Sequence, residues 1–195
     1  MKQKSFVLFL VFTFFFFTIS GCAGSRFKTD LKNTLHPESL RLIYNTQPIN
    51  FKELSKCDDL SVRFVNAETR DADMNIVPGA IFSPSWNINP RELTDDIIKY
   101  MEKSYRQCRV LPSKSSRKEI HLSLNEITGW PTGIFRFTSY SRLQINVFIP
   151  ELNFKETYTL DRSSGYLYDA MAYSIHEFTW QIINDPVVQD YILCR

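Results

Sequence analysis

The sequence predicts an α+β domain in which a largely antiparallel sheet carries two helices on one face. Two observations lead to this fold class. Several segments of the C-terminal half alternate apolar and polar residues with a period of two, which is typical of antiparallel strands covered on one face. Two other segments, one before and one after those strands, place apolar residues at helical spacing. Strands in succession with helices segregated to one side indicate an α+β architecture.

The chain begins with the three parts of an export signal. Lys2 and Lys4 give a positive start, residues 5–18 form an apolar run rich in Phe, and Ile-Ser-Gly precedes Cys22. The apolar run is shorter than the roughly 20 residues that a membrane-spanning helix needs. We therefore expect this segment to be removed from the mature protein.

These features predict three parts of the chain. Residues 1–21 form the signal peptide, and residues 22–37 form a flexible tether, because they show no periodicity. Residues 38–195 form a single domain. Removal of the signal leaves 21 basic and 21 acidic residues. This balance gives no electrostatic reason to expect a nucleic-acid partner.

The domain is expected to open with two strands, at 40–44 and at 60–65 within LSVRFVNAETRD. The acidic residues of 68–73 are predicted to form a charged turn. The segment 74–86 contains two prolines and is predicted to be a loop or an edge segment. Both strands alternate apolar and polar residues, so that each presents one apolar face.

The first helix has clear boundary signals. Asn89 suits the N-cap, Pro90 suits the first helical position, and Glu92 lies where a capping box requires it. We expect the helix to end near Cys108 and a short strand and turn, RVLPS, to follow. Its apolar stripe consists of Leu93, Ile97, Ile98, Met101 and Tyr105.

Three longer strands and a helical segment complete the domain. The strands are expected at 119–130, 135–149 and 152–160, with a hairpin turn at Pro150-Glu151. A helix is expected from Leu167, and Asp185-Pro186 should end it and start a short final helix. The alternation between 143 and 149 places Leu143, Ile145, Val147 and Ile149 on one face.

No motif in the sequence predicts catalysis. His176 begins a segment, HEFTW, that resembles the zinc motif H-E-x-x-H, but Trp180 occupies the position of the second His. We expect His176 and Glu177 to be polar residues on the outer face of the helix. There is no G-x-G-x-x-G or Walker motif. We therefore expect a protein that is not an enzyme, with no catalytic residues, no metal and no cofactor.

The three cysteines after Cys22 do not fit a zinc-binding spacing. In an oxidising compartment, two of Cys57, Cys108 and Cys194 can form a disulfide, which leaves an odd thiol. Buried free thiols are an equally acceptable arrangement. The sequence leaves the pairing open.

The segment Ile19-Ser20-Gly21-Cys22 resembles the lipobox of bacterial lipoproteins. This resemblance implies cleavage before Cys22, a lipid on its sulfur, and attachment to a membrane. Ala23 follows where retained lipoproteins have Asp, which implies the outer membrane with the domain facing the periplasm. The alternative is an ordinary secretory signal with a chance cysteine.

The order of the elements also resembles the YajG-type envelope lipoproteins and similar small accessory lipoproteins. The resemblance rests on SVRFVNAETRD, LTDDIIKYMEKSYRQCRVL, HLSLNEITGW and the C-terminal SGYLYDAMAYSIHEFTWQIINDPVVQDYI, over roughly residues 60–193. It departs from the family pattern where Asn66-Ala67-Glu68 replaces an Asp and where Cys108 replaces a Gly. It implies an accessory role in envelope assembly or transport.

These observations predict a membrane-anchored, non-catalytic module that binds another envelope protein. Aromatic residues off the apolar faces, namely Tyr140, Tyr173 and Trp180, are the candidate partner patch, because aromatic side chains anchor interfaces. The alternative is a lipoprotein that binds a lipid or a small ligand in an apolar cleft. An envelope hydrolase is the least favoured class, because no catalytic motif is present.

Overall fold

The computed structural model describes residues 60–77, 86–132 and 138–194, together with Leu31, Leu35, Asn50 and Phe51. The predicted signal peptide, Cys22, most of the predicted tether and the predicted strand at 40–44 lie outside the described residues.

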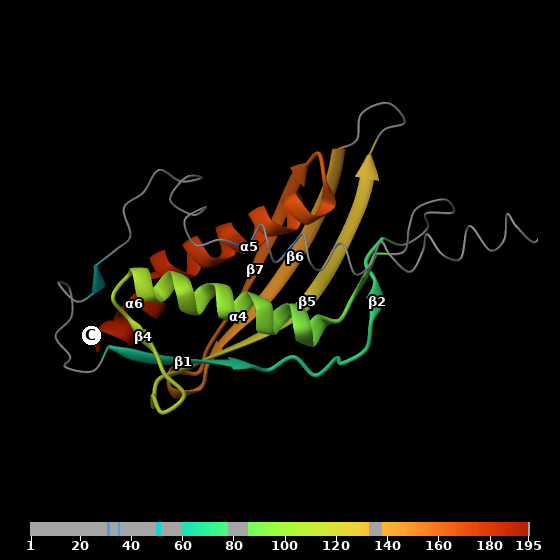
Figure 1. The fold of residues 1–195 in the computed structure, drawn as a ribbon. Coiled ribbons are helices and arrows are strands. Elements are labelled where there is room, and N and C mark those ends of the chain that lie inside the picture. The colour runs from blue at the N-terminus through green and yellow to red at the C-terminus, as the bar shows by residue number, and fades with distance from the viewer. Residues whose placement is uncertain are drawn as a thin grey trace, which may run out of the picture.

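The main sheet has five strands in the order β4-β1-β5-β6-β7 (Figure 1). The three long strands, β5, β6 and β7, form an antiparallel meander, whereas β1 runs parallel to both β4 and β5. The α+β class with a mostly antiparallel sheet is thus confirmed. The strands are β1 (Ser61–Asn66), β4 (Leu111–Pro112), β5 (Glu119–Thr132), β6 (Thr138–Ile149) and β7 (Phe154–Ser164).

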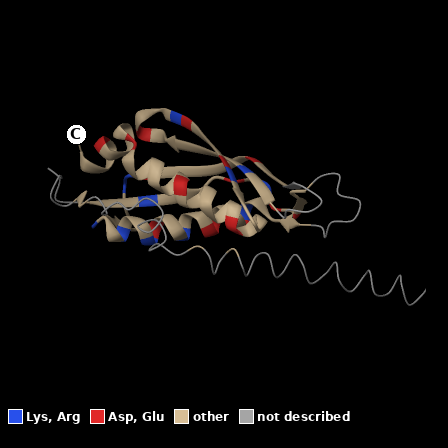
Figure 2. Cartoon of the chain, turned by 90° about the horizontal axis from the view of Figure 1, so that it is seen from above, with Lys and Arg blue, Asp and Glu red and all other residues tan. Residues whose placement is uncertain are grey.

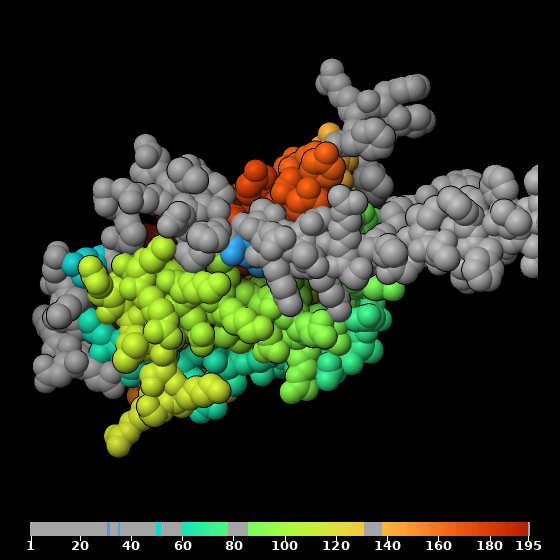
Figure 3. All heavy atoms as spheres, viewed as in Figure 1, coloured from blue at the N-terminus to red at the C-terminus, as the bar shows by residue number. Residues whose placement is uncertain are grey.

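Two long helices, α4 (Pro90–Gln107) and α5 (Leu167–Asn184), lie on the same face of the sheet (Figure 1). The short α6 (Pro186–Leu193) follows α5. In the space-filling view α4 covers much of one side of the molecule, with part of α5 at the surface above it (Figure 3). The alternation predicted for β6 faces this helical layer, since Leu143, Ile145, Val147 and Ile149 are all buried.

The helix boundaries follow the predicted signals. The Asn89 side chain accepts hydrogen bonds from the backbone N–H groups of Arg91 and Glu92, which caps α4. Asp185 ends α5, and its carboxylate accepts from the N–H groups of Val187 and Val188 at the start of α6. One aspartate therefore separates the two helices and caps the second.

The hairpin between β6 and β7 is also confirmed. A single 3-10 turn, η1 (Pro150–Leu152), joins the strands, and Asn153 closes it in the left-handed conformation with φ 48°. A bulge at Leu124/Glu126 interrupts the pairing of β5 with β6. The segment predicted as a loop or edge contributes β2 (Met74–Asn75), which pairs with β3 (Asn87–Ile88) in a small ribbon.

The described cysteines differ in state. Cys108, at the C-terminal end of α4, is buried and is not disulfide-bonded. Cys194 is disulfide-bonded, with its partner outside the described residues. The structure therefore contains both a buried thiol and a disulfide, the two arrangements that the sequence left open.

Candidate functional site

Exposed aromatic side chains gather where β5 and β7 end and β6 begins. Trp130 and Tyr140 lie opposite each other on β5 and β6, and their rings stack with centroids 5.8 Å apart and an interplanar angle of 11°. Just beyond β7, Tyr166 stacks on Tyr168 at 5.4 Å. Trp130, Tyr140 and Tyr166 are 40%, 37% and 62% exposed. We call these four residues the aromatic end.

The structure does not bring the predicted patch together. Ser141 bonds Ser174 of α5 through their hydroxyls at 3.1 Å, so Ser141 faces the helices. Its neighbour Tyr140 therefore points to the opposite face of the sheet. Tyr173 is exposed on α5, and Trp180 is partly buried two turns further along the same helix. Tyr140 is thus separated from the other two by the thickness of the sheet.

Sequence reasoning missed three residues of this surface, Trp130, Tyr166 and Tyr168. Trp130 was missed because the bulge after Leu124 reverses the alternation of β5: counted from Leu124, Trp130 falls on the buried face, whereas the bulge moves it to the open face with Thr128. No local pattern identified Tyr166, which lies between a strand and a helix. Only the fold places it beside the end of β7.

The face of the sheet away from the helices is covered by cross-strand polar pairs. Arg142 Nε donates to Asp161 at 2.7 Å, and this hydrogen bond lowers the pKa of Asp161. Thr157 donates to Asn146 at 2.8 Å on the same two strands. Such pairs hold neighbouring strands in register on a solvated face. The open face of β6 and β7 is therefore polar and carries paired side chains.

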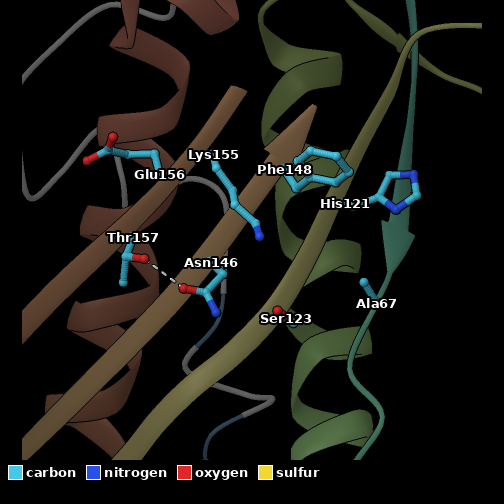
Figure 4. A pocket seen from close by; sticks show the side chains of 8 residues that line it. All are labelled: Ala67, His121, Ser123, Asn146, Phe148, Lys155, Glu156 and Thr157. Carbon is cyan, nitrogen blue, oxygen red and sulfur yellow. Dashed lines mark hydrogen bonds between the residues drawn. The ribbon is translucent and has the colours of Figure 1, made fainter. Parts of the chain in front are cut away.

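A hollow of about 550 Å³ lies on this open face, away from the aromatic end. Figure 4 shows Lys155 reaching toward Phe148 and Asn146, while Glu156 points away from them. The Lys155 ammonium lies 5.9 Å from the centre of the Phe148 ring. The lining consists of Ala67, His121, Ser123, Asn146, Phe148, Lys155, Glu156 and Thr157.

Charged groups continue along the same face from the hollow onto β1. His121 Nε2 lies 3.0 Å from Glu119 Oε2, and Arg63 donates to the other Glu119 oxygen at 2.9 Å. The hydrogen bond with His121 and the charge of Arg63 lower the pKa of Glu119. These side chains bind one another in a surface ion-pair network, and such networks contribute little to the free energy of unfolding.

A second hollow, of about 810 Å³, lies at the end of the sheet opposite the aromatic end. Lys118 crosses beside it and donates to the carbonyl of Ile192 at 2.7 Å. The Tyr191 hydroxyl accepts from the backbone N–H of Glu119, and burial raises the pKa of Tyr191 to about 12. Leu152 and Val187, both exposed, form part of its wall. These contacts attach α6 to the start of β5.

Glu68 is a buried carboxylate and not part of a solvated turn, which corrects the prediction for 68–73. Its side chain is 3% exposed and accepts hydrogen bonds from Arg70 and from the backbone N–H of Leu124 at 2.9 Å. Arg70 also donates to the carbonyl of Leu124. Mainly because of the Arg70 side-chain hydrogen bond, the pKa of Glu68 falls to about 2. The pair fastens the end of β1 to the bulge of β5.

The prediction that His176 lies on an outer face was wrong. His176 is 1% exposed, and its Nδ1 lies 2.6 Å from the hydroxyl of the buried Tyr100 on α4. Glu177, its neighbour, is partly exposed and forms an ion pair with Arg162 of β7. The histidine therefore joins the two long helices within the core.

Within the described ranges there is no group of three or more His, Cys, Asp or Glu side chains placed to hold a metal ion. The described helices include none that is both long and apolar enough to span a membrane. Basic and acidic side chains are interspersed over the described elements (Figure 2).

Comparisons with known proteins find little. No protein-family model matches the sequence, and no curated protein matches it. The fold is similar to the crystal structure of protein XCC0632 from Xanthomonas campestris, of the DUF330 family. That similarity has a TM-score of 0.45 at 11% sequence identity, and it covers 69% of this chain and 87% of that one.

Proposed function

We propose that this protein is a lipid-anchored lipoprotein of the bacterial envelope that acts as a non-catalytic accessory by binding another envelope protein. The anchor is the lipid on Cys22, and the domain faces the periplasm from the outer membrane. The observation that carries the binding role is the aromatic end, where three exposed aromatic side chains occupy one end of the domain. Tyr and Trp are the side chains that most often anchor protein interfaces.

The geometry of the aromatic end suits a binding surface. The rings of Trp130 and Tyr140 are held by stacking on adjacent strands, so they lose little conformational entropy when a partner covers them. Anchoring also confines the domain to a membrane surface, which raises its effective concentration for partners in the same membrane. A modest interface is then sufficient for a functional complex.

Replacement of both Trp130 and Tyr140 by alanine should remove the partner. We expect chemical crosslinking in intact cells to link the wild type to one envelope protein, and the double variant to lose at least nine-tenths of that product. Val187→Ala is the matched control, because Val187 is 39% exposed beside the hollow at the opposite end of the sheet. Equal crosslinking of the double variant and the control would contradict the proposal.

The second candidate function is the binding of a small ligand on the open sheet face. The hollow beside Lys155 and Phe148 favours it, because a cation and an aromatic ring converge there. Its lining combines polar and apolar side chains, which suits a small polar molecule better than the acyl chains of a lipid. Lys155→Ala should abolish such binding and leave the crosslink at the aromatic end unchanged.

A further inference from the structure

The outer edge of β7 is long and regular. All eleven residues of β7 pair with β6 without a shift in register. On its other side, no described residue makes a backbone hydrogen bond to it. The strand contains no proline and no bulge, which are devices that protect sheet edges. Such an edge offers a row of backbone donors and acceptors to another strand.

The sequence of β7 is complementary to itself. Thr159 is the midpoint of the strand, and a two-fold axis through Thr159 pairs β7 in full with an antiparallel second copy. Glu156 then faces Arg162 of the second copy, and the same contact occurs twice. No like charges face each other in this register. The other facing pairs are Phe154 with Ser164, Lys155 with Ser163, Thr157 with Asp161, and Tyr158 with Leu160.

Neighbouring registers are less favourable. An axis through Tyr158 shortens the paired stretch to residues 154–162; it places Lys155 opposite Asp161 but leaves the Glu156 carboxylate opposite Leu160. An axis through Leu160 also shortens it and matches no opposite charges. Opposite charges that face each other across strands stabilise their pairing. The register about Thr159 matches as many opposite charges as the register about Tyr158, and it has the longest overlap of the three.

The helical layer is compatible with this pairing. α5 lies over β6 and β7, where Ser174 contacts Ser141 and Glu177 pairs with Arg162. Strands in a sheet are about 4.8 Å apart. A helix centred between β6 and β7 therefore comes about 10 Å from its copy, which is the separation at which helices pack. The five N–H groups of Arg162 can serve both Glu177 and Glu156 of the second copy.

We propose that β7 pairs antiparallel with β7 of a second copy of this chain about a two-fold axis at Thr159, so that the two sheets become one. Trp130 and Tyr140 lie on β5 and β6, away from this edge, and stay exposed in both copies, whereas Tyr166 comes to lie near Leu152 of the second copy. The dimer therefore presents two copies of the Trp130–Tyr140 surface.

A single cysteine at the axis tests this register. In the full chain with Thr159→Cys, the new cysteine meets its own copy at a Cα separation of about 4.5–5.5 Å, within the range of disulfides. We expect mild oxidation to convert most of the protein into a covalent dimer. Thr157→Cys is the control, since it is equally exposed but comes to lie about 14 Å from its copy. Oxidised wild type gives the baseline for the native cysteines.

A charge reversal makes the test independent of the thiol. Glu156→Arg, added to Thr159→Cys, places two cations opposite each other and should reduce the crosslinked dimer at least tenfold. Because Glu156 is exposed, the circular dichroism spectrum should not change. Equal crosslinking at positions 157 and 159, an unchanged yield with Glu156→Arg, or a monomeric wild type by sedimentation at every concentration would each overturn the proposal.

Discussion

Glu68→Gln should destabilise the domain by about 3 kcal/mol at pH 7 and by much less at pH 3. The folded-state pKa of Glu68 lies near 2, below the ordinary value of 4.5. A shift of this size corresponds to about 3 kcal/mol at 1.36 kcal/mol per pKa unit. Because the folded pKa is lowered, this stability is present above pH 4.5 and is lost as the pH falls from 4.5 toward 2.

The measurement is the free energy of unfolding in urea for wild type and variant at both pH values. Glu126→Gln is the control, because the Glu126 side chain lies on the open sheet face with one long hydrogen bond, at 3.4 Å, from Thr128. Its effect should stay within about 0.5 kcal/mol. A loss for Glu68→Gln that is equal at pH 3 and pH 7 would show that the ionised carboxylate is not the source of the stability.

His176→Ala should cost about 3 kcal/mol or more of unfolding free energy. The substitution leaves a cavity between α4 and α5, and it removes the group that contacts the Tyr100 hydroxyl at 2.6 Å inside the core. Thermal unfolding should therefore begin at a clearly lower temperature, with the same folded spectrum at 10 °C.

Tyr100→Phe separates the hydrogen bond from the packing. Alone, it should cost about 1–2 kcal/mol, because it removes a hydroxyl but keeps the ring. Combined with His176→Ala it should add little, since the contact is already lost. The resulting coupling energy of about 1 kcal/mol is the signature of a direct bond. Strict additivity of the two losses would refute that bond.

Local sequence signals were sufficient for most of the secondary structure. The caps at Asn89 and Asp185 are encoded within a few residues, and so is the turn at Pro150. The alternation along β6 likewise identified its buried face correctly. These features depend on neighbours in the chain, which a single sequence displays.

Features that depend on distant residues could not be predicted. The parallel pairing of β1 with β4 joins a strand of only two residues to a segment some fifty positions away. The same holds for Glu68, whose buried partner atoms belong to Leu124, and for His176, whose partner is Tyr100. Glu68 looked like a surface residue because its neighbours in the chain are polar, and His176 because it and Glu177 are adjacent polar residues of a helix.

The sequence predicted which kind of side chain forms the candidate site, but not which residues come together there. Aromatic side chains were the correct class to examine, but spacing along the chain could not show that Tyr140 lies across the sheet from Tyr173 and Trp180. The pairing of Trp130 with Tyr140 arises from the register of β5 and β6. That register is a property of the hairpin as a whole.

The central claim is that a lipid on Cys22 holds a partner-binding domain at a membrane. The most direct test is the intact mass and membrane fractionation of wild type and Cys22→Ser in a diderm bacterium. We expect the wild type to have the mass of residues 22–195 plus acyl groups and to fractionate with the outer membrane, whereas Cys22→Ser stays unprocessed. Soluble, unacylated protein from both chains would contradict the account.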